Sequence, residues 1–192
     1  MNIGTEGILI LSTILLISYM SFVTLYEDNL TPIKSTIDNK EYMVQDKDDA
    51  QDAANLIAAI RQKLVLLVEH LIKTTPGDDP RIIMLKSNFN PESLKEGVDN
   101  SGYTSYSINK GEQIVLCLRN KNKLMDINTM MFVVLHELTH IVTESIGHPP
   151  EFWENFRWIL EESINIGIYQ KTDYSKESVE YCGMTISSSP LE

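Results

Sequence analysis

The stretch His136-Glu137-Leu138-Thr139-His140 decides the fold of this chain, and a further histidine, His148, follows it closely. The whole chain has 4 histidines, so this short segment holds most of them. Side chains four positions apart lie on one face of a helix, so His136 and His140 can bind one metal ion together. Glu137 would then lie beside the metal ion, where it can accept a proton from a bound water.

The residues around the motif indicate a buried helix. The run 130–135 is apolar on every side, and Leu138, Ile141 and Val142 continue it. A helix that is apolar all round is a buried helix, and burying two imidazoles and a carboxylate without partners is costly. Core histidines satisfied by hydrogen bonds are the alternative, but a Zn²⁺ ion with its water suits all three side chains. The sequence therefore predicts a zinc site with Glu137 as the catalytic residue.

Capping residues set the expected ends of this helix. Asp126 or Asn128 can cap its first turn, and Gly147 is a residue type that commonly ends a helix. His148 would lie just past that end, at a turn formed by Pro149 and Pro150.

The third metal ligand has two sets of candidates. The turn after the helix can swing His148 back toward the other two histidines, which makes it the first candidate. A second helix is predicted over 151–162, from its apolar residues at helical spacing. Glu161 or Glu162 on that helix is the competitor, because one large class of zinc enzymes takes a downstream glutamate as its third ligand.

The motif, followed by His148-Pro149-Pro150-Glu151-Phe152-Trp153, resembles the WLM and SprT-like zinc metallopeptidases. The resemblance covers roughly residues 100–165 and implies a zincin-like domain that acts on a protein or peptide substrate. It also implies that His136, His140 and His148 bind zinc and that Glu137 is the general base. The rest of the chain, including Tyr181-Cys182-Gly183-Met184, is similar to uncharacterised proteins of large DNA viruses. Virion proteins are therefore candidate partners.

A β-hairpin is predicted directly before the metal helix. Strand-like runs over 103–108 and 112–118 flank the glycine-containing turn 109–111, and the second run should pack on the helix. In peptidases with such a helix, an edge strand can hold the substrate backbone by strand addition. Three tyrosines are candidates for stabilising the oxyanion of the reaction: Tyr103, Tyr106 and Tyr181.

The N-terminus predicts a membrane anchor. Residues 7–25 contain no charged side chain, and a helix needs about 20 mostly apolar residues to cross roughly 30 Å of hydrocarbon. Tyr19 and Tyr26 lie near one end, as interfacial aromatics do. A cleaved signal peptide would need positive residues before the apolar run, and none precede it. An uncleaved transmembrane helix is thus expected, in a single-pass protein of a host or virion membrane whose orientation the flanking charges do not specify.

The predicted fold class is α+β, with an N-terminal transmembrane helix followed by a small zincin-like domain whose β-hairpin packs on the motif helix. Four segments are expected: a tail over 1–6, the anchor over 7–25, a polar linker over 26–50 and a metallopeptidase-like domain over 51–192. Within the domain, 52–73 has the apolar stripe of a packed helix, and Ile82 to Leu85 is predicted as a short strand.

The net charge and the cysteine count argue against two classes of protein, nucleic-acid binders and disulfide-rich domains. The net charge is −11, and a phosphate-binding protein should show a basic stripe, so no nucleic-acid partner is expected. Cys117 and Cys182 are too few for a disulfide framework and are expected to be small buried residues of a reduced protein. His70 stands alone on its helix and is expected to be structural.

Two functions from different classes remain. The first is a membrane-anchored zinc metallopeptidase that hydrolyses peptide bonds through a zinc-bound water activated by Glu137. The alternative is a structural or assembly protein of a membrane or virion that keeps the fold without turnover. Glu137 favours the enzyme, because a purely structural zinc site needs no general base and usually has four protein ligands.

Overall fold

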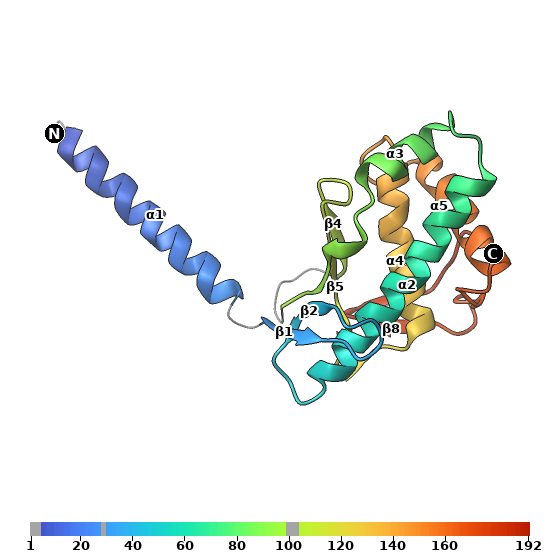
Figure 1. Cartoon of the computed structure of the whole chain (residues 1–192), viewed down its shortest axis with the longest axis horizontal. Helices are drawn as coiled ribbons and strands as arrows, with labels where there is room; N and C mark the ends of the chain where they lie inside the picture. The colour runs from blue at the N-terminus through green and yellow to red at the C-terminus, as the bar shows by residue number, and fades with distance from the viewer. Residues whose placement is uncertain (1–4, 28–29, 99–103) are drawn as a thin grey trace.

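The structure, a computed structural model, describes residues 5–27, 30–98 and 104–192 of the chain (Figure 1). Within these residues the strands form a three-stranded sheet of order β3-β5-β4 and the two-stranded pairs β1–β2, β6–β7 and β8–β9. The elements, in chain order, are α1 (Thr5–Glu27), β1 (Leu30–Lys34), β2 (Glu41–Gln45), α2 (Ala50–Thr74), α3 (Pro80–Asn88), the 3-10 helix Pro91–Ser93, β3 (Leu94–Glu96), β4 (Tyr106–Ile108), β5 (Gln113–Leu116), β6 (Arg119–Asn120), β7 (Lys123–Leu124), α4 (Ile127–Val142), α5 (Pro150–Asn165), β8 (Val179–Tyr181) and β9 (Met184–Ile186).

Helix α4, which carries the histidine motif, lies at the centre of the domain. It packs against α2, α3, α5 and β4, and every residue from Thr129 to Leu135 is buried (Figure 1). Asp126 caps the helix, as its carboxylate accepts the backbone N–H groups of Asn128 and Thr129. The predicted end at Gly147 is wrong: α4 ends at Val142, because the next residue is already extended.

The predicted hairpin is present as β4 and β5, which pair antiparallel with Ser107 opposite Ile114. Strand β5 also pairs in parallel with β3, so β4 lies at the edge of the sheet. Gly111 in the connecting turn has φ +109°, and a Cβ there would lie 2.7 Å from Ile141 of α4. A glycine is therefore needed for the turn to pack this closely on the metal helix.

The two predictions made for the segment before the sheet had different outcomes. The stripe over 52–73 is confirmed as helix α2, whose apolar face is buried in the core. The strand predicted from Ile82 to Leu85 is wrong, because both residues belong to α3. Asp79 caps α3 through the backbone N–H of Arg81, and Pro80 is its first residue, so local capping favours a helix there.

The expected transmembrane helix is not supported. Among the residues that the structure describes, no helix has both the length and the apolar character needed to cross a membrane. Residues 7–25 do lie on a helix, α1, which projects away from the domain (Figure 1). The fold class and the single-pass membrane localisation are corrected accordingly.

The segment 26–50, expected as a polar linker, contains the β1–β2 hairpin. Leu30 pairs with Gln45 and Lys34 with Glu41, and the hairpin packs on α2. Tyr42 and Val44 are buried in the same core as the helices. Ordered structure that packs on the domain therefore begins before residue 51.

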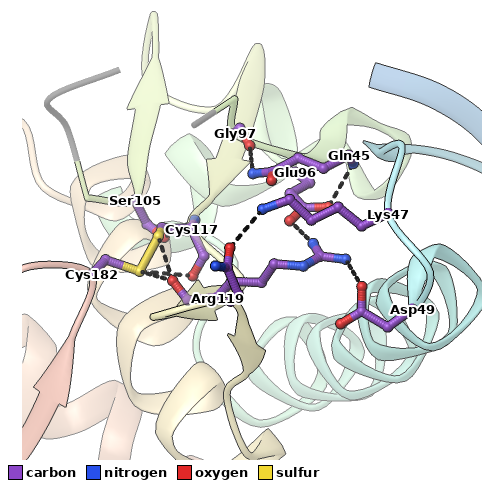
Figure 2. Close-up of polar contacts among 10 residues, drawn as sticks. Gln45, Lys47, Asp49, Glu96, Gly97, Ser105, Cys117, Arg119 and Cys182 are labelled. Atoms are coloured by element: carbon purple, nitrogen blue, oxygen red, sulfur yellow. Dashed lines mark hydrogen bonds and ion pairs between the residues drawn. A yellow bond between two sulfur atoms is a disulfide. The ribbon is translucent and has the colours of Figure 1, made fainter. Parts of the chain in front are cut away.

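A buried ion pair joins this N-terminal hairpin to the sheet. Glu96 at the end of β3 is fully buried, and its carboxylate accepts the backbone N–H of Gln45 and pairs with the Arg119 guanidinium. Arg119 also pairs with Asp49 at 2.6 Å, at the start of α2 (Figure 2). One guanidinium thus links three parts of the chain that are distant in sequence.

The expectation that the two cysteines are reduced is wrong. Cys117, directly after β5, and Cys182, directly after β8, form a disulfide (Figure 2). The bond joins residues 65 positions apart. It fastens the C-terminal hairpin β8–β9 to the central strand of the sheet, a link that two isolated cysteines in a sequence do not reveal.

We expect the substitution Arg119→Met to lower the free energy of unfolding by about 3–5 kcal/mol, because it leaves the buried Glu96 carboxylate without its charged partner. Urea unfolding followed by circular dichroism measures the change. The control is Lys176→Met, which removes the exposed pair with Asp173 and should leave the midpoint unchanged. Equal midpoints for wild type and Arg119→Met would contradict the role given to this pair.

Candidate metal centre

The three histidines of the motif region converge at one point. His136 and His140 lie on α4, with ring centroids 5.0 Å apart. The Nε2 atom of His148 lies 3.0 Å from the Nε2 atom of His136. One nitrogen from each of the three rings lies within 4.8 Å of the others, an arrangement that could hold a metal ion.

Helix α5 fixes the loop that carries His148. The indole N–H of Trp153 donates to the backbone carbonyl of His148 at 3.1 Å, and the Asn155 amide donates to the Thr143 hydroxyl at 3.1 Å. Phe152 packs against all three imidazoles, with ring centroids 4.6–4.8 Å away. His148 is therefore positioned by both ends of its loop, although its own side chain is exposed.

The competing ligands lie elsewhere. Glu162 Oε2 is 2.7 Å from Nε2 of His70 on α2, so this carboxylate faces a different helix. Glu161 is exposed on α5 and does not line the cavity that contains the three histidines. The structure thus brings His148, and not these glutamates, to His136 and His140. It also gives His70 a partner on α5, in keeping with a structural role.

Glu137 lies on the buried side of the motif. Its side chain is only 5% exposed, and burial raises its pKa to about 7. The hydroxyl and the backbone N–H of Ser107, on β4, both donate to its carboxylate, which partly opposes that rise. Strand β4 therefore fixes where this carboxylate points.

The imidazoles of His136 and His140 are held in their neutral form. Burial, followed by the charges of the neighbouring histidines, lowers the pKa of His136 to about 3. The pKa of His140 falls to about 4, again mainly through burial and then through His148. A neutral imidazole presents the lone pair that a metal ion requires, so this environment favours coordination over protonation.

A cavity of about 540 Å³ opens over the site. Its lining includes the three histidines and Glu137, together with residues of β4, the loop after α4 and the β8–β9 hairpin. Of the oxyanion candidates, Tyr106 and Tyr181 line the cavity, while Tyr103 lies outside the described residues. The Tyr181 hydroxyl is hydrogen-bonded to the Ser105 hydroxyl, and burial together with the nearby Glu137 carboxylate raises its pKa, which keeps the phenol protonated.

Three contributors to the site were not singled out as site residues in the sequence. Ser107 looks like an ordinary strand residue, Phe152 looks like a packing aromatic, and Met184 lies far from the motif. Each reaches the site through tertiary structure, and only the resemblance in the segment that starts at His148 pointed to Phe152.

Three imidazoles, two of them from helix α4, converge beside a buried carboxylate and form a site that could hold a metal ion. Comparison with protein families matches residues 38–189 to the WLM domain. That match covers most of the chain, so the chain belongs to the WLM domain family. Family membership supports a metallopeptidase-type function, and the matched range includes strand β2 of the N-terminal hairpin.

Similar proteins occur in viruses. The chain is 31% identical over 189 residues to an uncharacterised protein of Acanthamoeba polyphaga mimivirus, covering 96% of this chain and 95% of that one. It is 25% identical over 167 residues to an uncharacterised protein of Invertebrate iridescent virus 6, covering 82% and 92%. Among solved structures, it is similar to the crystal structure of Wss1 from Saccharomyces cerevisiae, with 22% identity, 64% and 85% coverage and a TM-score of 0.46.

Replacing His148 by alanine should weaken zinc binding by more than about 100-fold. Mutation of a residue that only hydrogen-bonds to a metal ligand typically weakens metal binding by about 10–100-fold. The matched control is Glu162→Gln, which removes a carboxylate from the competing helix and should keep the wild-type affinity. Competitive titration with a chromophoric chelator measures both. Wild-type zinc affinity in His148→Ala would remove His148 as the third ligand, and loss of affinity in Glu162→Gln would assign that role to Glu162.

Proposed function

We propose that this chain is a zinc-dependent metallopeptidase that hydrolyses peptide bonds in protein substrates. The observation that carries the proposal is the placement of Glu137. Its carboxylate is buried beside three convergent imidazoles and lines the same cavity as they do. A structural metal site would have no use for a buried carboxylate aimed by Ser107 into a cavity of this size.

The donor set fits zinc. Zinc–nitrogen bonds of about 2.0–2.1 Å in a tetrahedral site separate the nitrogens by about 3.3 Å, close to the 3.0 Å between His136 and His148. Three protein ligands would leave a fourth position open, as in catalytic zinc sites. The chemistry that a zinc ion supplies in such a site is Lewis acidity, which lowers the pKa of a water toward about 7 and polarises the scissile carbonyl.

Glu137 is proposed as the group that moves the proton. Its carboxylate accepts the proton of the attacking water and later passes it to the leaving amine nitrogen. Ser107 keeps the carboxylate directed at the cavity, since it donates two hydrogen bonds to it from β4. Burial by α4 keeps bulk water away from the carboxylate, so the proton is transferred to the substrate and not to solvent.

The substrate backbone is proposed to pair with β4. This strand lies at the edge of the sheet and its residues Tyr106 and Ser107 line the cavity, next to α4. An extended peptide added to that edge would lie beside the cavity that contains the histidines. Main-chain pairing of this kind gives affinity with little dependence on sequence.

The variant Glu137→Gln should bind zinc as the wild type does and lose about 10²–10⁴-fold in kcat, because the amide keeps the size of the side chain and cannot accept the proton. Metal analysis and cleavage of an unfolded protein substrate measure the two properties on the full chain. Glu144→Gln, an exposed position in the loop after α4, is the control and should keep full activity. Equal turnover by wild type and Glu137→Gln, both with zinc, would remove Glu137 from the mechanism and favour an assembly protein.

A further inference from the structure

The C-terminal hairpin forms one wall of the cavity. Strands β8 and β9 pair with Val179 opposite Ile186 and Tyr181 opposite Met184. Tyr181, Met184 and Ile186 all line the cavity that contains the histidines. The chain supplies this wall from beyond α5, more than thirty positions after the last residue of the motif region.

The wall is apolar and partly open to solvent. Ile186 is almost fully buried, whereas Met184 is 47% exposed. Phe132 and Val133 of α4 line the same cavity, so apolar side chains come to it from two separate elements. A thioether beside aliphatic and aromatic groups adapts its shape to large apolar side chains and offers no charge to a polar one.

Polar and covalent links, besides the packing of Tyr181 and Ile186 in the core, hold the hairpin to the rest of the domain. The Asn120 amide donates to the carbonyl of Glu180 at 3.0 Å, and the Tyr181 hydroxyl bonds to Ser105. The covalent link is the disulfide, which binds Cys182, the neighbour of Tyr181, to Cys117. Cys117 in turn donates its backbone N–H to the Ser105 hydroxyl at 3.0 Å (Figure 2).

These contacts form a closed loop of four residues. Tyr181 is hydrogen-bonded to Ser105, Ser105 to Cys117, and Cys117 is joined by the disulfide to Cys182, the neighbour of Tyr181. The disulfide and the phenol hydrogen bond therefore fix the same end of the hairpin. The disulfide sulfurs also lie 3.3–3.4 Å from the carbonyl oxygen of Arg119 (Figure 2). We call the disulfide and the Tyr181–Ser105 hydrogen bond the clamp. The clamp therefore contacts Arg119, the residue that pairs with the buried Glu96.

We propose that the β8–β9 hairpin receives a large apolar substrate side chain beside the scissile bond, and that the Cys117–Cys182 disulfide holds this wall in its binding position. The inference rests on the proposed peptidase function and names the substrate preference of that site. Met184 is its specificity-determining residue, because it is the wall residue with the most surface left to contact a ligand. Cys117 and Cys182 are positioning residues that act through Tyr181.

Reduction of the disulfide would release the wall. Two molecules of an external thiol reduce the S–S bond, so that each cysteine gains an S–H. The two external thiols are oxidised to one disulfide, and two electrons are transferred. In an assay a trialkylphosphine does the same, because the phosphine is oxidised to its oxide by the oxygen of one water, whose two hydrogens go to the thiols. The hydrogen bonds to Asn120 and Ser105 and the packing of Tyr181 and Ile186 in the core then remain.

The first test compares the oxidised full chain, the phosphine-reduced chain and the double variant Cys117→Ser/Cys182→Ser, each with zinc content measured. Peptides with Leu or Phe next to the cleaved bond should show a KM about tenfold or more higher in the reduced chain and in the variant, with zinc content unchanged. The double variant should not respond to phosphine. A KM that is the same in all three forms would overturn the clamp.

A second variant keeps the proposal testable if the double variant fails to fold. Met184→Ser should raise KM for Leu and Phe peptides about tenfold and leave KM for Ser and Asn peptides unchanged. The control Ile83→Ser, an exposed apolar position on α3, should change neither. An equal KM change for all peptides, or none, would remove Met184 from specificity.

Hydrogen exchange separates failure of this inference from failure of the peptidase function. Backbone amides of residues 179–186 should exchange at least tenfold faster after reduction, while those of α4 should not change. This readout requires no cleavage. Unchanged protection of the hairpin would overturn the clamp even in an active peptidase, and faster exchange would support the clamp even if no peptide were cleaved.

Discussion

The structure depends on one constraint, which is that a helix buried on almost every side must carry polar side chains. Helix α4 is surrounded by α2, α3, α5 and β4, yet it holds two imidazoles and a carboxylate. Buried groups of this kind are stable only with partners. The chain meets the constraint by directing all three toward one cavity and by supplying His148 and Ser107 there from neighbouring segments.

The rest of the fold positions those partners. The edge strand β4 brings Ser107 to the carboxylate, and its turn can approach α4 only because Gly111 has no side chain. Helix α5 anchors the loop of His148 through Trp153 and Asn155. Farther out, the guanidinium of Arg119 joins β3 to the start of α2, beside the disulfide (Figure 2). The N-terminal hairpin is thus connected to the sheet through buried polar contacts, which gives a physical reason for counting it as part of the domain.

The sequence predicted the parts of the site that follow from local rules. Helical spacing, capping by Asp126 and the glycine-containing turn yielded α4 and the β4–β5 hairpin. The apolar stripe of α2 could be read in the same way. The turn at Pro149 and Pro150 made His148 the first candidate for the third ligand, and the resemblance to a family implied the same. Its role as a ligand is a proposal.

Long-range features could not be predicted, because no local rule encodes them. The disulfide needs the distance between Cys117 and Cys182, which only the folded chain supplies. The strand expected at Ile82 failed because the cap at Asp79 outweighed a short apolar run. The anchor predicted over 7–25 is not supported, because no helix among the described residues has both the length and the apolar character that a membrane span needs. In each case the outcome depended on contacts or on the properties of a whole segment, and not on the type of a single residue.

The central claim is that His136, His140 and His148 bind one zinc ion next to Glu137. Zinc X-ray absorption of the full chain tests it most directly. The account predicts about three imidazole nitrogens at about 2.0–2.1 Å, with one further light-atom ligand in the open position. Removing His148 should reduce the imidazole signal to two. A sulfur ligand at about 2.3 Å, or three imidazoles retained in the His148 variant, would contradict the claim.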